Sequence, residues 1–323
     1  MKALVQDGSG SADVLRLQEI EKPVLAEGRV LVKVHAASVN ALDWHTVHGG
    51  FALRVVGSLM RQPQENPVRG VDLAGVVEAV GPGVTRFAPG DEVFGGAPAA
   101  FAEYASARED SLVLKPQGLS FEQAAAIGVA GRTALQGLRD VAQVKPGQRV
   151  LICGAGGGVG TFAVQIAKAL GAHVTAVTST RNLDLVRTLG PDELIDYTQE
   201  DFTRRAGRYD VIFDVAAHRS LSDLRRVLAP GGTLVLAGAA KRGGIVAIFA
   251  RIAAAFVRSR LFRQRIVFYM AKASRDDLVV LNELIEAGKV CPAIDRTYPL
   301  SEAAEAVRYV GSGQARAKVV ITM

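Results

Sequence analysis

The chain has 323 residues, of which 49% are hydrophobic and 22% charged, with a net charge of +6. This length and balance predict a soluble globular protein with a large core and two domains. Two cysteines, Cys153 and Cys291, are too few for a disulfide framework or a four-thiolate zinc site. The sequence opens without a signal-peptide pattern and has no uncharged apolar run of roughly 18 residues, so a cytoplasmic location is expected.

The first third of the chain is rich in β-branched residues, glycine and proline. Apolar segments at residues 29–39, 72–84 and 90–96 predict strands, and Pro-Gly and Gly-Pro-Gly sequences predict turns between them. This region is therefore expected to be mainly β-structure.

From residue 121 onward, short apolar segments alternate with segments of helical spacing. Helices are expected at 121–141, 161–171, 181–190 and 221–232, and strands at 149–153, 173–178, 192–197, 210–216 and 233–239. This alternation predicts an α/β fold with a doubly wound parallel sheet of the Rossmann type. A helix that begins at residue 276 and is ended by Gly288, a short helix at 301–310 and a strand at 317–322 close the chain.

A glycine-rich stretch, CGAGGGVG, lies between an expected strand and an expected helix. Gly154, Gly157 and Gly160 form G-x-x-G-x-x-G at the place of a Rossmann turn. Glycine lets the backbone approach a diphosphate, and the amides and positive dipole at a helix start attract that anion. These glycines, with Gly158 and Val159, are predicted to bind a dinucleotide. The alternative is that they serve only the tight packing of strand against helix.

The next strand ends at Thr178 and lacks the Asp or Glu that accepts hydrogen bonds from the ribose in NAD-specific sites. Ser179 and Arg181, which follow it, can donate to a 2′-phosphate instead, so NADPH is the predicted cofactor. Alternatively, Ser179 and Thr180 cap the next helix and Arg181 is a solvated first-turn residue.

A series of further segments connects the chain to a known family. They are HAASVNALDW (35–44), RGVDLAGVVEAVGPGV (69–84), PGDEVFG (89–95), FAEYA (101–105), GVAGRTALQGL (128–138), LAPGGTLVLAG (228–238) and the closing ARAKVVI. In their order and spacing they resemble the zinc-independent branch of the medium-chain dehydrogenase/reductases, the quinone oxidoreductase group related to zeta-crystallin. The resemblance covers nearly the whole chain.

The resemblance implies a GroES-like β-rich substrate domain at 1–122 and 272–323. It implies a Rossmann domain at 123–271, with a basic apolar insertion near 241–265. An active site in the cleft between the domains and a homodimer are also expected from the family.

Site residues follow from the matching motifs. Asn40 and Asp43 correspond to the cleft floor near the nicotinamide, although Asn and Asp also bond local backbone in turns. Thr133 corresponds to a threonine near the nicotinamide ribose, or else serves helix packing. Ala237 and Gly238 should lie beside the nicotinamide. Tyr197 corresponds to a tyrosine near the adenine ribose phosphate, or else covers the sheet edge.

No metal site is predicted. The zinc-dependent branch has a ligating Cys where this chain has Ala41 or Leu42. That branch also has Gly-His-Glu where this chain has Gly-Val-Asp, at residues 70–72. Without a Lewis acid, a quinone or α,β-unsaturated carbonyl is the favoured acceptor, because conjugation spreads the incoming negative charge. Hydride transfer from NADPH to such an acceptor is the predicted reaction.

The basic charge is concentrated in one segment. Residues 241–275 hold nine of the 38 basic residues and no acidic one, and the rest of the chain has 29 basic and 32 acidic residues. This segment lies partly between the expected strands 233–239 and 266–271 and mixes aliphatic residues with arginines. It is interpreted as a packed helical insertion or as a membrane-surface contact, and a nucleic-acid contact is disfavoured because no recognised motif accompanies it.

Two other functions stay open from the sequence. One is alcohol dehydrogenase or aldehyde reductase activity. The other is a non-catalytic protein that senses NADPH or binds a polyanion, because a fold by itself does not determine function.

Overall fold

The computed structural model describes the chain except residues 9, 49–66, 206 and 238–262. Gly238 and most of the basic segment therefore lie outside the described residues. The chain forms two compact units: unit 1 is Met1–Arg132, Ala273–Glu286 and Pro292–Met323, and unit 2 is Thr133–Lys272 and Ala287–Cys291. The first division falls after Arg132, not after residue 122 as the sequence suggested. Helix α3 (Phe121–Ala125) packs on strands of unit 1, which explains the difference.

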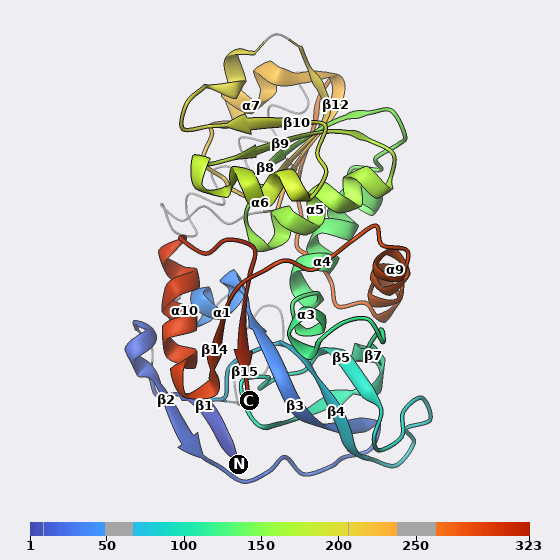
Figure 1. Ribbon diagram of the computed structural model, residues 1–323, viewed down its shortest axis with the longest axis vertical. Coiled ribbons are helices and arrows are strands. Elements are labelled where there is room, and N and C mark those ends of the chain that lie inside the picture. Colours follow the sequence, from blue (N-terminus) through green and yellow to red (C-terminus); the bar gives the residue numbers. More distant parts are fainter. Residues whose placement is uncertain (9, 49–66, 206, 238–262) are drawn as a thin grey trace. The chain divides into compact units, whose positions relative to one another are not determined.

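Unit 2 is built on a six-stranded sheet in which every pairing is parallel (Figure 1). In spatial order its strands are β10 (Glu193–Asp196), β9 (His173–Thr178), β8 (Arg149–Cys153), β11 (Tyr209–Asp214), β12 (Leu228–Leu236) and β13 (Arg265–Phe268). The inner strands are almost fully buried, as expected of apolar runs in a parallel sheet. The predicted doubly wound α/β fold is confirmed.

From β8 the chain adds strands β9 and β10 toward one edge of the sheet, and from β11 it adds β12 and β13 toward the other edge. Helix α5 (Gly158–Ala169) and helix α6 (Leu183–Thr188) connect β8, β9 and β10, whereas α7 (Leu221–Val227) connects β11 to β12. Because parallel crossovers are right-handed, outward connections in opposite directions place their helices on opposite faces. Short helices η4 (Thr180–Asn182) and η5 (Phe202–Arg204) follow β9 and β10.

Unit 1 holds a seven-stranded, mainly antiparallel sheet and a two-stranded one. The large sheet runs β14 (Ile294–Pro299), β15 (Lys318–Thr322), β3 (Arg29–Val39), β4 (Asp72–Val80), β5 (Glu92–Gly96) and β7 (Leu112–Leu114), with β6 (Tyr104–Arg108) paired to β3. The small sheet pairs β1 (Lys2–Gln6) with β2 (Leu15–Glu19). The predicted GroES-like, β-rich domain is confirmed.

Several helices belong to unit 1, and among them α3 (Phe121–Ala125) packs on the central strands β3 and β4. These helices are α1 (Ala41–His48), α3, the start of α4 (Gly128–Leu135), α9 (Arg275–Glu286) and α10 (Ala303–Ser312), with short helices η1 (Ala12–Val14), η2 (Glu109–Ser111) and η6 (Leu300–Glu302). Beyond the division between the units, α4 continues as a π-helical turn, η3 (Gln136–Val141). No helix among the described residues is both long and apolar enough to cross a bilayer.

Each unit has its own core. In unit 1, Val32, Leu73, Phe101 and other fully buried side chains lie under the large sheet. In unit 2, Leu151, Ile212 and their neighbours fill the space between sheet and helices. Since each core is continuous, each unit can hold its strands in register by burial of apolar surface.

Two predicted helices were wrong in extent. The segment 221–232 is helical only to Val227, and strand β12 then begins at Leu228 and contains Pro230. Proline lacks the N–H that helix continuation needs, which explains the early stop. The segment 121–141 breaks into α3, α4 and η3. Helix α1 was not predicted, because its sequence has no apolar periodicity.

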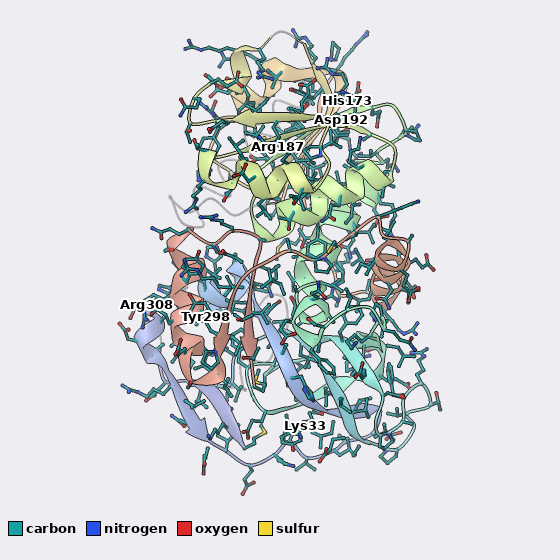
Figure 2. The ribbon with its side chains drawn as sticks, in the orientation of Figure 1. Lys33, His173, Arg187, Asp192, Tyr298 and Arg308 are labelled. Atoms are coloured by element: carbon teal, nitrogen blue, oxygen red, sulfur yellow. The ribbon has the colours of Figure 1, made fainter. Side chains whose placement is uncertain are left out.

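Gly75 in β4 faces the backbone of β3 and provides a test of this packing. A Cβ on Gly75 would lie 2.1 Å from the carbonyl oxygen of Lys33, a residue that Figure 2 labels. We expect Gly75→Ala to lower the free energy of unfolding by about 2–3 kcal/mol, because neither strand can move away. Urea denaturation measures this loss. Gly118→Ala is the control, since its Cβ meets no atom within 4 Å; equal losses in both variants would contradict the prediction.

Candidate functional site

The glycine-rich turn joins β8 to α5 at the carboxyl edge of the parallel sheet. Gly154 has φ +86°, a left-handed conformation that favours glycine. A Cβ on Gly160 would lie 2.1 Å from the carbonyl oxygen of Gly154, whereas a Cβ on Gly157 would meet nothing closer than 3.5 Å. Tight packing therefore accounts for Gly154 and Gly160. Gly157 instead leaves an open face on the turn.

Helix α5 begins at this open face without a side-chain cap. Its N-cap residue is Gly157, so no side chain accepts a hydrogen bond from the first-turn amides. The first amides of a helix have no intrahelical acceptor, and the helix dipole adds partial positive charge to them. Gly158 and Val159 are half-buried here, in the first turn. The turn therefore fits the diphosphate of a dinucleotide.

A hollow opens beside the turn at the same edge of the sheet. Its lining, from the ends of β8 and β9 and from the segments that follow β10 and β11, includes Gly154, Val177, Tyr197, Phe202, His218 and Arg219. Tyr197 is 44% exposed, so its ring is available to a ligand. The structure thus brings the predicted Tyr197 to the glycine-rich turn.

His218 and Arg219 did not emerge from the sequence as site residues. They follow the carboxyl end of β11, which is the position that could have identified them. An ion pair of 3.4 Å with Asp201 holds Arg219, whose guanidinium lies over the Phe202 ring. Cys153 also lines the hollow, but burial raises the pKa of its thiol well above the ordinary value, so it stays protonated.

The turn after β9 contains the residues predicted to select the cofactor. Ser179 is the N-cap residue of η4, yet its side chain makes no capping hydrogen bond. Thr180 does not cap the helix either, because its hydroxyl donates to Asp196 on β10 at 2.5 Å. Helix capping therefore does not explain why Ser and Thr occupy positions 179 and 180. Arg181 is exposed in the same turn.

Asp196 places a carboxylate beside this turn, where the sequence predicted none. It lies opposite Thr178 in the register of β10 and β9. Thr198 donates to it through its backbone N–H at 2.9 Å and its hydroxyl at 2.7 Å. The hydrogen bond from Thr180 lowers the pKa of Asp196, so this carboxylate is ionised at neutral pH.

Asn40 and Asp43 belong to a buried polar network in unit 1. The side-chain amide of Asn40 donates to Asp72 at 2.9 Å and accepts from the ammonium of Lys318 at 2.6 Å. Its backbone N–H donates to Asp43 at 2.7 Å. The hydroxyl of Ser38 also donates to Asp72, at 3.3 Å. Each of these side chains is at most 7% exposed.

The network reaches the start of α4. The backbone N–H of Val129, in the first turn of that helix, donates to both carboxylate oxygens of Asp72 at 3.0 Å. A Cβ on Gly128 would lie 2.1 Å from the same carboxylate. The dipole of α4 therefore adds to the stabilisation of this buried charge. Sequence reasoning missed Asp72 and Lys318 as members of one cluster.

Burial governs the ionisation of this network. It raises the pKa of Asp43 to about 7, and the charge of Asp72 acts in the same direction, against the hydrogen bond from Asn40. Burial likewise lowers the pKa of Lys318, which both carboxylates oppose. The charge of Lys318 also lowers the pKa of Asp43, and Asp43 in turn raises the pKa of the half-buried Arg69 against the effect of burial. Asp43 is therefore poised to change charge near neutral pH.

The remaining predicted site residues are Thr133 and Ala237. Both lie near the carboxyl ends of β12 and β13 in the parallel sheet. The carbonyl of Thr133 accepts a hydrogen bond from the Tyr269 hydroxyl, which follows β13. Ala237 directly follows β12, and its N–H donates to the carbonyl of Asp214 at 3.0 Å. Both are half-buried. Within the described residues, no group of three or more His, Cys, Asp or Glu side chains has the arrangement of a metal site.

Two protein-family models match the chain. Residues 26–117 match the alcohol dehydrogenase GroES-like domain, and residues 189–321 match a model described as zinc-binding dehydrogenase. The first lies within unit 1, and the second spans parts of both units.

Relatives match over almost the whole chain. The NADPH-dependent alkenal/one oxidoreductase of Arabidopsis thaliana is 35% identical, over 99% of this chain and 79% of its own. A solved structure of the quinone oxidoreductase from Coxiella burnetii has a TM-score of 0.86 at 31% identity, over 100% and 99% of the two chains. A structure named NAD-dependent alcohol dehydrogenase has the same TM-score and identity and covers all of both chains.

The buried Asp43 gives a pH dependence that can be measured. Its pKa is about 7 in the folded chain and about 3.9 in an unfolded one. Between these values the folded chain binds more protons, so stability falls as the pH rises towards 7. We expect the free energy of unfolding of the wild type, relative to Asp43→Asn, to fall by about 2.5 kcal/mol between pH 5 and pH 8.

Urea denaturation across this pH range measures the difference. Asp7→Asn is the matched control, because Asp7 is exposed. Its stability relative to the wild type should not change with pH in this range. If the stability of Asp43→Asn relative to the wild type also does not change with pH, Asp43 is ionised throughout this range.

Proposed function

Because the chain belongs to the medium-chain dehydrogenase/reductase family, in its quinone and alkenal/one oxidoreductase branch, we propose that it is an oxidoreductase acting on a conjugated acceptor. The acceptor would be a quinone or an α,β-unsaturated carbonyl. The observation that carries this proposal is the uncapped start of α5 beside the hollow at the carboxyl edge. A dinucleotide bound there supplies the hydride.

Residues of unit 2 would hold the dinucleotide. The first-turn amides of α5, at Gly158 and Val159, would bind the diphosphate. The hollow at Tyr197 would receive the adenosine end, with Arg219 at its rim. Thr133 and Ala237 would face the nicotinamide end. All of these residues except Thr133 follow the carboxyl ends of strands, where open α/β folds bind ligands, and Thr133 on α4 contacts Tyr269, which follows β13.

The acceptor class follows from the side chains where zinc ligands would be needed. Val71 has no donor atom, and Asp72 accepts a hydrogen bond from Asn40, which in turn accepts one from Lys318. Reduction of a simple carbonyl concentrates negative charge on one oxygen and calls for a Lewis acid or strong proton donor. A conjugated acceptor spreads that charge. We therefore propose a zinc-independent reaction.

Asn40 would help to hold the shape of the site and would not donate a proton in this reaction. Its amide nitrogen has two hydrogens, and these point to Asp72 at 2.9 Å and to the carbonyl of Ser38 at 3.4 Å. Both are therefore engaged inside the protein. Asp43, bonded to the N–H of Asn40 and buried, would likewise shape the site.

NADPH is the proposed cofactor, although two opposite charges flank its proposed 2′-phosphate. Arg181 and the uncapped hydroxyl of Ser179 favour the phosphate. Asp196, ionised beside Thr180, opposes it. The preference for NADPH over NADH would therefore be moderate. An NAD-linked alcohol dehydrogenase among the similar structures supports keeping alcohol or aldehyde turnover as the second candidate function.

A homodimer is proposed through the edge strand β13. Among the described residues no strand pairs with its outer side, and Phe268 and Met270 are 37% and 57% exposed. A membrane-surface contact through 241–275 and a cytoplasmic location remain proposals from the sequence.

Oxidation of the reduced dinucleotide by the purified, chelator-treated protein tests the function. A quinone, an enone and a simple aldehyde are offered, each with NADPH and with NADH, and absorbance at the nicotinamide band is followed. We expect saturable turnover with the conjugated acceptors and at least about tenfold lower kcat/KM with the aldehyde, a difference of about 1.4 kcal/mol. Turnover of the aldehyde alone would favour the second candidate. Binding of NADPH without any turnover would favour a sensing protein.

Charge reversal tests the cofactor preference. We expect Arg181→Glu to raise the Kd of NADPH by about tenfold more than that of NADH, because a carboxylate would face the 2′-phosphate. Asp196→Asn should act in the opposite direction. Fluorescence titration of both cofactors measures these changes. Arg187→Glu is the control, on the exposed face of α6 (Figure 2); equal effects at positions 181 and 187 would refute the role of Arg181.

A further inference from the structure

A second hollow lies at the amino edge of the sheet of unit 2. It has a volume of about 460 Å³, and its lining includes Arg208, Ser222, Arg225, Arg226, Arg263 and Gln264. Arg208 comes directly before β11, Arg225 and Arg226 end α7 before β12, and Arg263 lies just before β13. The amino ends of three adjacent parallel strands therefore bring these arginines together.

This hollow is separate from the proposed dinucleotide site. The glycine-rich turn follows the carboxyl end of β8, and in a parallel sheet all carboxyl ends share one edge. His173 and Asp192, labelled in Figure 2, mark the amino ends of β9 and β10, on the same edge as the arginines. A ligand of the arginines would therefore bind at the opposite edge of the sheet.

Hydrogen bonds hold two of the guanidinium groups in place. Arg208 donates through Nη1 to the carbonyls of Arg226 at 2.9 Å and Leu228 at 3.3 Å. Arg225 donates through Nε to the side-chain oxygen of Gln264 at 3.0 Å. Gln264 in turn donates to the carbonyls of Arg225 at 3.1 Å and Leu228 at 2.9 Å. These contacts tie the end of α7 to the start of β13.

The positive charge of the arginines around the hollow is larger than the negative charge of the groups beside them. Among the described residues, the lining has four arginines and no acidic side chain. Asp223, beside it, pairs with Arg226. The carboxyl end of a helix contributes about half a negative charge, here from α7. An excess of about two positive charges therefore remains around a concave surface.

We propose that this hollow, the arginine pocket, binds a phosphate group. A guanidinium matches the oxygens of a phosphate and can bind two of them at once, and arginine is the residue that proteins use most for this purpose. The hydroxyl of Ser222 adds another donor, and the volume suits a ligand of small-molecule size. A soluble phosphate ester and the headgroup of an anionic phospholipid both present this group. The proposal does not depend on the proposed oxidoreductase reaction.

Titration with inorganic pyrophosphate tests the proposal on the full chain. The pocket variant is Arg226→Gln/Arg263→Gln, which leaves the contacts of Arg208 and Arg225 in place. The charge-matched control is Arg16→Gln/Arg86→Gln, two exposed arginines of unit 1. Calorimetry should show at least about tenfold weaker binding in the pocket variant and less than twofold change in the control. Binding at the glycine-rich turn is common to both variants and cancels in this comparison.

A second measurement distinguishes the two sources of the phosphate. The same proteins are sedimented with phosphatidylcholine vesicles that either contain or lack phosphatidylglycerol. Loss of binding to the anionic vesicles in the pocket variant alone supports the proposal and identifies a lipid headgroup. Weaker pyrophosphate binding without any vesicle binding supports it and identifies a soluble ester.

Other outcomes would overturn the proposal. One is equal behaviour of the pocket and control variants toward both pyrophosphate and vesicles. Another is binding of single-stranded RNA that only the pocket variant loses, with pyrophosphate and vesicle binding unaffected, which would indicate a polynucleotide surface. If thermal unfolding shows that the double variant is destabilised, Arg263→Gln alone replaces it, since Arg263 is exposed and lies outside the helices and strands.

Discussion

The buried carboxylate of Asp72 is the group on which the arrangement of unit 1 depends. It lies at the first residue of β4 and is fully buried. Its hydrogen bonds come from Ser38 and Asn40 at the end of β3 and from Val129 at the start of α4. A buried charge is tolerated only where donors and opposite charge surround it. Each of these elements must therefore take up its observed position for the carboxylate to keep its hydrogen bonds.

Lys318 completes this arrangement from the last strand of the chain. Its ammonium bonds to the Asn40 amide rather than directly to either carboxylate. Asn40 therefore separates the cation from Asp72 and is oriented by both. Replacement of any one partner would leave another buried polar group unsatisfied, which commonly costs more than the lost hydrogen bond itself. The constraint explains why a residue that resembles a catalytic one is so fully engaged with its neighbours.

Local patterns predicted the parallel sheet well and the polar contacts poorly. Strands β8 and β9 match the predicted segments residue for residue, because buried parallel strands are continuous apolar runs. The glycine-rich turn was equally visible, since its packing and its proposed binding of a diphosphate both favour glycine. By contrast, Asn40 and Lys318 are 278 residues apart in the sequence. Asp196 meets Thr180 only because β10 pairs with β9. Such contacts follow from strand order, which periodicity does not reveal.

The two edges of the parallel sheet would bind anions by different physical means. At the carboxyl edge, α5 begins, and its amides and dipole supply partial positive charge without any charged side chain. At the amino edge, α7 ends, and the dipole there has the opposite sign. An anion at that edge must therefore be held by full side-chain charges that outweigh the helix end. The arginines that gather at α7, including Arg208 on the carbonyls of its last turn, supply these charges. One fold thus offers backbone dipoles at one edge and guanidinium groups at the other.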